Sequence, residues 1–245
     1  MFQPSSPCLR SMGNATRLFI LKSPGPEVTE IEIERRLRAV IPNAALEVVA
    51  LPEVPNIRLA LLQQSYPQHL LDSDAVAKIM DTPMYWAFCW ASGQVLARFI
   101  MDNPHYVKGR RVLDFGAGSG VVAIAAAIAG ARAVVVCDTD PLALLACRHN
   151  AKLNGVDLAL AHSWESYEGT IDLILAADVL YDRANLSWLQ VFLQRAPSVL
   201  VADSRIRDFT AENYRPLSSS RSSTLPDLDE SQEFRQVKVY LGSRA

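Results

Sequence analysis

An acid and three alternating glycines give the clearest chemical signal in this sequence of 245 residues: Asp114, Gly116, Gly118 and Gly120. The apolar residues 112–113 lead into the motif, and the apolar run 121–129 after it has the composition of a buried helix. A strand, a glycine turn and a helix in this order present backbone N–H groups to an anionic ligand group. Glycine suits such a turn because it adopts positive φ without strain, and because a Cβ atom would hold the ligand away from the backbone.

The spacing of the glycines separates two kinds of nucleotide site. A dinucleotide fingerprint of the form G-x-G-x-x-G that starts at Gly116 needs its third glycine where Val121 stands. The sequence has G-x-G-x-G instead. A nicotinamide-dependent oxidoreductase is therefore disfavoured, and it remains an alternative that a panel of cofactors would test.

A second acid follows the next predicted strand. The apolar run 133–137 ends in Asp138, about twenty residues beyond the glycines, where nucleoside-binding units hydrogen-bond the ribose hydroxyls. The pair Asp140-Pro141 also starts a helix well, so Asp138 has an alternative interpretation as a turn or capping acid. We favour the ribose role.

A third acid, Asp178, follows the apolar run 171–177, and Tyr181 comes shortly after it. In a doubly wound sheet, ligands bind outside the carboxyl ends of the strands, where the strand order reverses. Both side chains would then face the cleft from the side opposite the glycine loop. The alternative for Asp178 is a helix N-cap after the strand, without a part in the chemistry.

Tryptophans flank these motifs. The segment 83–93 is the densest aromatic cluster of the chain, and its Trp86 and Trp90 either plug the core or wall the cofactor or the incoming nucleophile. Trp164 follows the predicted strand 158–161, where it either stacks on an adenine or packs as an ordinary core residue. The sequence leaves both alternatives open.

Alternating strands and helices must position these residues, which predicts an α/β fold. Beside the strand that leads into the glycines, we predict strands at 133–137, 158–161, 171–177, 199–202 and 237–241, and helices at 94–100, 121–129, 141–150 and 184–196. The Ser- and Asp-rich stretch 217–233 reads as a loop or edge excursion. Further upstream, a helix at 27–40 and strands at 46–51 and 57–62 form a small lobe. We therefore divide the chain into a disordered N-terminus (1–16), a small α+β lobe (17–78) and an α/β domain (79–245).

Composition limits the function classes. Hydrophobic residues make up 50% of the chain and charged residues 20%, which allows a sizeable core. A net charge of −2 gives no bulk attraction to nucleic acid or to an anionic membrane, so we expect neither as a partner. The four cysteines show no metal-ligand spacing, so we expect reduced thiols, no metal site and a cytoplasmic protein. The first 26 residues hold no acid, and we prefer a disordered start to a transit peptide.

Four segments together resemble the class I, seven-β-strand methyltransferases that use S-adenosyl-L-methionine (AdoMet): 85–94, 112–120, 150–155 and Asp178-x-x-Tyr181. Within that superfamily they are similar to the family 16 protein-lysine methyltransferases, above all to those that act on the β-subunit of electron transfer flavoprotein. The resemblance covers roughly residues 80–245. It implies a doubly wound, seven-stranded, Rossmann-like sheet, AdoMet as cofactor, and catalytic roles for Asp178 and Tyr181. It implies cofactor contacts for Asp114, Gly116, Gly118, Gly120, Asp138, Trp164 and Trp90.

The implied reaction is N-methylation of a lysine in a folded protein by a monomeric enzyme, with the β-subunit of electron transfer flavoprotein as the first candidate substrate. The compartment would be the mitochondrial matrix if the chain is eukaryotic. Ribosomal protein L11 methyltransferases share this core, but their usual Asn-Pro-x-x motif after the fourth strand is absent here. A small-molecule N-methyltransferase and a catalytically silent AdoMet-binding scaffold are the remaining alternatives.

Overall fold

The computed structural model describes residues 26–41, 43–66, 83–165, 167–206, 209–228 and 230–244. The predicted N-terminal segment 1–16 and the predicted domain boundary near residue 78 lie outside these ranges. Within them, no helix is both long and apolar enough to cross a membrane.

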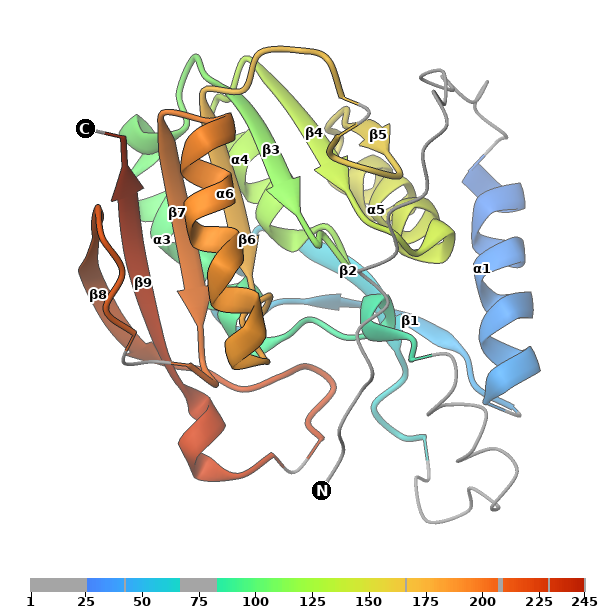
Figure 1. The fold of residues 1–245 in the computed structure, drawn as a ribbon. Helices are drawn as coiled ribbons and strands as arrows, with labels where there is room; N and C mark the ends of the chain where they lie inside the picture. Colours follow the sequence, from blue (N-terminus) through green and yellow to red (C-terminus); the bar gives the residue numbers. More distant parts are fainter. Residues whose placement is uncertain are drawn as a thin grey trace.

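A seven-stranded sheet organises the main domain, with the strand order β5-β4-β3-β6-β7-β9-β8 (Figure 1). Its strands are β3 (Arg111–Phe115), β4 (Ala133–Cys137), β5 (Ala159–Ala161), β6 (Leu173–Ala177), β7 (Ser198–Asp203), β8 (Tyr214–Arg221) and β9 (Gln236–Ser243). The strands from β5 to β7 run parallel, whereas β9 runs antiparallel to both β7 and β8. The predicted seven-stranded α/β sheet is confirmed.

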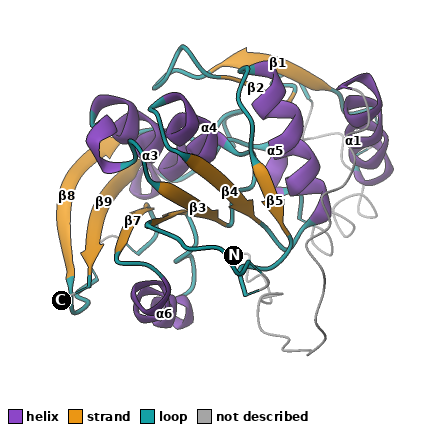
Figure 2. Cartoon of the chain, turned by 90° about the horizontal axis from the view of Figure 1, so that it is seen from above, coloured by secondary structure: helices purple, strands orange, loops and turns teal. Residues whose placement is uncertain are grey.

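Helices cover both faces of the sheet: Figure 2 shows α3, α4 and α5 on one side and α6 on the other. The α-helices are α3 (Ala91–Asp102), α4 (Val121–Ile128), α5 (Pro141–Leu153) and α6 (Ser187–Arg195), and the 3₁₀ helices are η3 (Tyr85–Ala87), η4 (Pro104–Tyr106), η5 (Arg183–Leu186) and η6 (Gln232–Arg235). Neighbouring residues of a strand face opposite layers, so Val112 packs with α3 and α4 while Leu113 packs with α6. Because both faces are buried, the central strands are nearly continuous apolar runs, which made them predictable.

The small N-terminal lobe consists of one helix and one hairpin. Helix α1 (Pro26–Val40) precedes the antiparallel pair β1 (Leu46–Ala50) and β2 (Arg58–Leu62), as predicted from the sequence. Buried Ile33 and Leu37 of α1 share a core with Ala143 and Ala146 of α5 and with Trp86, which is 1% exposed. The core interpretation of Trp86 is therefore confirmed.

The prediction of a loop or edge excursion over 217–233 is wrong in its first part. Residues up to Arg221 belong to β8, the outermost strand, which pairs with β9 and has an irregularity between Pro216 and Ser218. An edge strand buries little, so β8 is rich in serine and lacks the apolar run that reveals a central strand. The rest of the stretch, up to η6, connects β8 to β9.

Two asparagines at the end of α5 attach the lobe to the main domain. The buried Asn150 accepts a hydrogen bond from the Ala60 N–H of β2 (2.8 Å) and donates one to the Ser119 carbonyl (2.9 Å). Asn154 exchanges two hydrogen bonds with the Arg58 backbone, at 2.9 and 2.7 Å, in a more exposed position. Both asparagines thus bind the same edge of β2, at alternate residues.

We expect Asn150→Ala to lower the free energy of unfolding by about 2–6 kcal/mol, because it leaves the Ala60 N–H and the Ser119 carbonyl without their partner and each such buried group costs about 1–3 kcal/mol. Asn154→Ala is the matched control: water can reach its partners, so its cost should be about 1 kcal/mol or less. Urea unfolding measures the free energy of unfolding of both variants. Equal losses of stability would contradict the difference between the buried Asn150 and the more exposed Asn154.

Candidate active site

The carboxyl ends of β3, β4 and β6 meet at one edge of the sheet. Strand β3 leads through α4 to β4 on one side, and the chain later returns to β6 on the other side of β3. The strand order therefore reverses between β3 and β6, the place where ligands bind in doubly wound sheets. The predicted residues that the structure places at this edge are Asp114, Gly116, Gly118, Gly120, Asp138 and Asp178.

The three glycines of the loop differ in what surrounds them. All have positive φ, at +69° for Gly116, +51° for Gly118 and +82° for Gly120. A Cβ atom at Gly120 would lie 3.2 Å from the Cα of Cys147 in α5, and one at Gly116 would lie 3.1 Å from a methyl of Val179. A Cβ atom at Gly118 would meet nothing within 4 Å. The outer glycines therefore permit close packing, whereas the middle one borders open space.

Asp138, directly after β4, braces the glycine loop. One carboxylate oxygen accepts from the Gly118 N–H at 3.0 Å, and the other accepts from the Asp140 N–H at 2.9 Å. Burial raises the pKa of this half-buried carboxyl, although these backbone donors oppose the shift. A carboxylate has about four lone-pair sites, so both oxygens can still accept hydroxyl donors. Asp138 is thus a turn acid that retains capacity for ribose, and the ribose role stays a prediction.

Asp114 lies inside the protein, only 2% exposed. Its carboxylate accepts from the Ala123 N–H at 3.0 Å, in the first turn of α4. Burial raises the pKa of Asp114 to about 7, and the nearby Asp138 adds to the shift. Asp114 therefore fixes the loop against the start of α4, and a direct contact between Asp114 and the cofactor stays a prediction.

Asp178 follows β6 and its carboxylate reaches helix α3. The Ser92 hydroxyl donates to Oδ1 at 2.5 Å, the Ser92 N–H donates to Oδ2 at 3.2 Å, and the Ser204 hydroxyl donates to Oδ1 at 3.3 Å. The capping acid of the 3₁₀ helix η5 that follows β6 is Asp182, which accepts from the Ala184 N–H. The alternative of Asp178 as the N-cap after its own strand is therefore wrong.

A second buried acid faces Asp178. Asp203 ends β7, is 0% exposed, and accepts backbone N–H groups of Leu180, Arg205 and Ile206. Burial and the Asp203 carboxylate raise the pKa of Asp178 to about 7, although Ser92 and Arg205 oppose the shift. Asp203 was predictable in principle because it ends an apolar run, as Asp138 does; buried serines carry no such sequence signal.

Exposed aromatic rings lie near this acid. Tyr181 is 39% exposed and Tyr85 is 46% exposed. Burial raises the pKa of Tyr85, and the neighbouring Tyr181 adds to the shift. Trp90, the residue before α3, donates from Nε1 to the Tyr85 carbonyl at 3.0 Å, and the two rings meet edge to face at 5.8 Å. Tyr181, Tyr85 and the half-buried Trp90 thus share one rim, and the predicted roles of Trp90 and Tyr181 stay predictions.

Trp164 packs within an aromatic cluster on the α6 side of the sheet. Its ring meets Phe115 at 6.3 Å and Trp188 at 5.8 Å, both edge to face. Its buried Nε1 has no hydrogen-bond partner among the described residues. These contacts favour the packing interpretation of Trp164, and the predicted stacking on an adenine stays a prediction.

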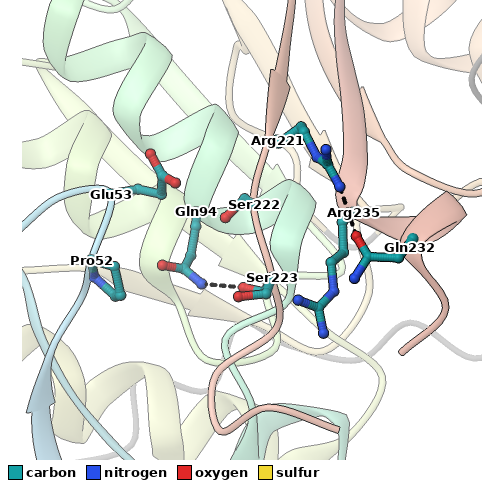
Figure 3. A pocket seen from close by; sticks show the side chains of 8 residues that line it. All are labelled: Pro52, Glu53, Gln94, Arg221, Ser222, Ser223, Gln232 and Arg235. Atoms are coloured by element: carbon teal, nitrogen blue, oxygen red, sulfur yellow. Dashed lines mark hydrogen bonds between the residues drawn. The ribbon is translucent and has the colours of Figure 1, made fainter. Parts of the chain in front are cut away.

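A separate surface pocket of about 230 Å³ lies on the flank of α3 (Figure 3), lined by Pro52, Glu53, Gln94, Arg221, Ser222, Ser223, Gln232 and Arg235. Gln94 donates to the Ser223 carbonyl across it at 2.7 Å. None of the predicted site residues lines it, so we assign it no part in the chemistry. Across the described ranges, no three His, Cys, Asp or Glu side chains are grouped so that they could hold a metal ion.

Comparison with known proteins points to methyltransferases. The family described as Ribosomal protein L11 methyltransferase (PrmA) matches residues 99–184. An electron transfer flavoprotein beta subunit lysine methyltransferase from Mus musculus is 36% identical over 139 residues, covering 54% of this chain and 54% of the mouse protein. A ribosomal protein L11 methyltransferase from Symbiobacterium thermophilum is 48% identical over 79 residues, covering 30% of this chain and 26% of that protein. The chain thus spans about half the length of the mouse relative.

The matched residues 99–184 run from α3 to η5 and contain the glycine loop, Asp138 and Asp178. The sheet around them has parallel strands from β5 to β7, with the antiparallel β9 between β7 and β8. The fold is a doubly wound, seven-stranded α/β sheet. A solved ribosomal protein L11 methylase from Lactobacillus delbrueckii subsp. bulgaricus has a TM-score of 0.48 at 24% identity, covering 63% of this chain and 79% of that one. In this sheet the glycine loop and Asp178 follow the neighbouring strands β3 and β6.

We expect the Asp114→Asn variant to gain stability relative to the wild type as pH rises from about 4 to about 7. The pKa of Asp114 is raised from 3.8 to about 7, so the stability that its protonated form contributes is lost as pH rises through that range. The difference in the free energy of unfolding between Asp114→Asn and the wild type should change by at most about 1.4 kcal/mol per pH unit.

Urea unfolding at several pH values measures this change, and Asp172→Asn is the control. A hydrogen bond from Arg111 lowers the pKa of Asp172 to about 2, so its contribution is constant above about pH 4 and falls only in stronger acid. A pH-independent difference for Asp114→Asn would contradict the raised pKa.

Proposed function

We propose that this protein is an AdoMet-dependent protein-lysine N-methyltransferase. The observation that carries the proposal is the half-buried Asp178, a carboxyl group with a pKa of about 7. It lies at the carboxyl end of β6, on the strand beside the glycine loop. Two exposed tyrosines, Tyr85 and Tyr181, lie close by. The similarity to enzymes named for methylation of a protein lysine supports the same reaction.

The residues of the glycine loop fit AdoMet. A Cβ atom at Gly118 would meet open space, and the Asp138 carboxylate that accepts the Gly118 N–H has lone pairs left for the ribose hydroxyls. Trp164 and Trp90 are the aromatic side chains that we assign to the walls of this site. When bound, AdoMet supplies a methyl group on a sulfonium, which is already electrophilic. The protein must therefore deliver a nucleophile with a free lone pair.

Asp178 is suited to take the proton that a lysine must lose. Transfer from a lysine ammonium to an ordinary aspartate costs about 9 kcal/mol, from their reference pKa values of about 10.4 and 3.9. With the pKa of Asp178 at about 7, the same transfer costs about 5 kcal/mol. Asp178 can also accept an N–H bond that orients the amine. The rings of Tyr181 and Tyr85 suit the apolar stem and the positive charge of the side chain.

We propose a folded protein as the substrate, with the β-subunit of electron transfer flavoprotein as the first candidate. Relatives matched over 139 and 143 residues, from Mus musculus and Danio rerio, are named for methylation of this subunit, which supports the choice. The matching family and shorter relatives are named for ribosomal protein L11, which makes that protein the second candidate. We further propose that the enzyme acts as a monomer in the cytoplasm, or in the mitochondrial matrix if the chain is eukaryotic.

We expect Gly118→Ala to weaken AdoMet binding at least tenfold, because its Cβ would occupy the open space beside the loop. Gly109→Ala is a matched control. Gly109 also has positive φ (+73°), and a Cβ atom there would meet nothing within 4 Å, but it lies before β3, at the opposite end of the strand. Both variants carry the same backbone strain, so calorimetry should show loss of affinity in Gly118→Ala alone. Equal affinities would remove the glycine loop from the cofactor site.

The substrate proposal is tested by offering the purified protein and AdoMet three acceptors: the β-subunit of electron transfer flavoprotein, ribosomal protein L11 and free lysine. We expect mass spectrometry to show methylated lysine in the β-subunit and none in free lysine, and we expect Asp178→Asn to abolish the transfer. Methylation of L11 alone would replace the first candidate with the second. Methylation of free lysine alone would contradict a protein substrate.

A further inference from the structure

We propose that Ser92 and Ser204 are positioning residues, which hold the Asp178 carboxylate in its ionised, oriented form for work on the acceptor amine. This inference deepens the proposed function and rests on it. It assigns a role to two buried hydroxyls, from α3 and from the turn after β7, that come together at one carboxylate.

Ser92 donates two hydrogen bonds to Asp178, one from its backbone N–H and one from its hydroxyl. It is the second residue of α3, where backbone N–H groups have no partner within the helix. Its N–H bonds Oδ2 and its hydroxyl bonds Oδ1, so a single residue fixes both oxygens of the carboxylate. Ser92 is 0% exposed and Ser204 is 5% exposed. Both hydroxyls are therefore shielded from solvent, and both donate to the Asp178 carboxylate.

The donor set matches the ionised form of the acid. An ionised carboxylate only accepts hydrogen bonds, whereas a protonated one must also donate. Three donors converge here: the Ser92 N–H, the Ser92 hydroxyl and the Ser204 hydroxyl. Both hydroxyls bond Oδ1, which leaves Oδ2 with the single long backbone bond of 3.2 Å. Oδ2 is thus the oxygen with the most capacity left for an incoming amine.

The charges around Asp178 explain why such donors are needed. The Asp203 carboxylate at the end of β7 and burial both favour the protonated acid. Arg205 favours the ionised acid, but its guanidinium already pairs with Glu230 at 3.0 Å and lies over the Phe234 ring. The Cys89 thiol, before α3, also faces Asp178, and burial raises its pKa well above the usual range, so it is neutral. Hydrogen bonds from the serines therefore favour the ionised form of Asp178, against the effects of burial and of the Asp203 carboxylate.

The backbone of Asp178 is held as tightly as its side chain. Its φ of +54° lies in the left-handed region that non-glycine residues rarely adopt. Its N–H donates to the Ala202 carbonyl at 3.1 Å, which fixes the residue to β7. Ser92 in turn lies two residues after Trp90, so the acid, the start of α3 and the aromatic rim are joined through one serine.

The test is a carboxyl ¹³C titration of the purified protein labelled at aspartate, with Asp178→Asn to assign the signal. Removal of a donor to the ionised form should raise the pKa of Asp178. We expect an upward shift of about one pH unit in Ser92→Ala and a smaller one in Ser204→Ala, since the second hydrogen bond is longer. Ser223→Ala is the matched control, because Ser223 lines the pocket on the other flank of α3. It should leave the titration unchanged.

The pH profile of kcat/KM for the methylated protein gives the second readout. The acid limb of the profile should move to higher pH in Ser92→Ala and Ser204→Ala, with AdoMet affinity retained. Titrations and profiles that match the wild type, or a loss that is uniform over pH, would overturn the positioning role. If Ser92→Ala does not fold, Ser204→Ala decides. Failure of the wild type to methylate any acceptor would instead contradict the proposed function, and the titration would still test the hydrogen bonds.

Discussion

Hydrogen bonds from backbone N–H groups to aspartates at the ends of parallel strands hold this site together. Each of four aspartates accepts a hydrogen bond from a backbone N–H. The pairs of acceptor and donor are Asp114 with Ala123, Asp138 with Gly118, Asp178 with Ser92, and Asp203 with Leu180. Each bond joins a strand end to the start of a helix or to a neighbouring loop. Where parallel strands stop, the chain must turn, and unpaired backbone donors there are costly when buried. The acids supply acceptors, and so determine how the glycine loop, α3 and the segment after β6 lie around the cleft.

Four acids at one edge have an electrostatic consequence. Burial raises the pKa of all four carboxyls, and a neighbouring acid adds to the shift at Asp114 and at Asp178. Asp114 and Asp178 therefore have pKa values of about 7, close to neutral pH. Asp178 differs from the others because two hydroxyls join its backbone donor. These hydroxyls can be removed without taking a partner from a backbone group, so the acid can be tuned separately from the fold.

Much of the sheet and the glycine loop was predictable, because both depend on local patterns. The central strands are buried on both faces and read as apolar runs, and Asp138 and Asp178 end such runs. Strand β8 was missed because it lies at the edge and owes its strand form to pairing with β9. Ser92 and Ser204 were missed for a related reason: a serine in a helix or a turn is ordinary in sequence. Only the approach of α3 to β6 makes Ser92 a hydrogen-bond partner of Asp178.

The attachment of the lobe likewise depends on contacts between distant segments, which the local sequence does not reveal. The segment 150–155 reads as the end of a helix, yet its Asn150 connects two distant backbones, the Ala60 N–H of β2 and the Ser119 carbonyl of the glycine loop. Helix α5 also brings Cys147 close to Gly120, so that a Cβ atom at Gly120 would lie only 3.2 Å from the Cys147 Cα. The hairpin, α5 and the loop are therefore in continuous contact. A displacement of β2 would act on the glycine loop through the Asn150 side chain, so the lobe supports this loop as well as covering α5.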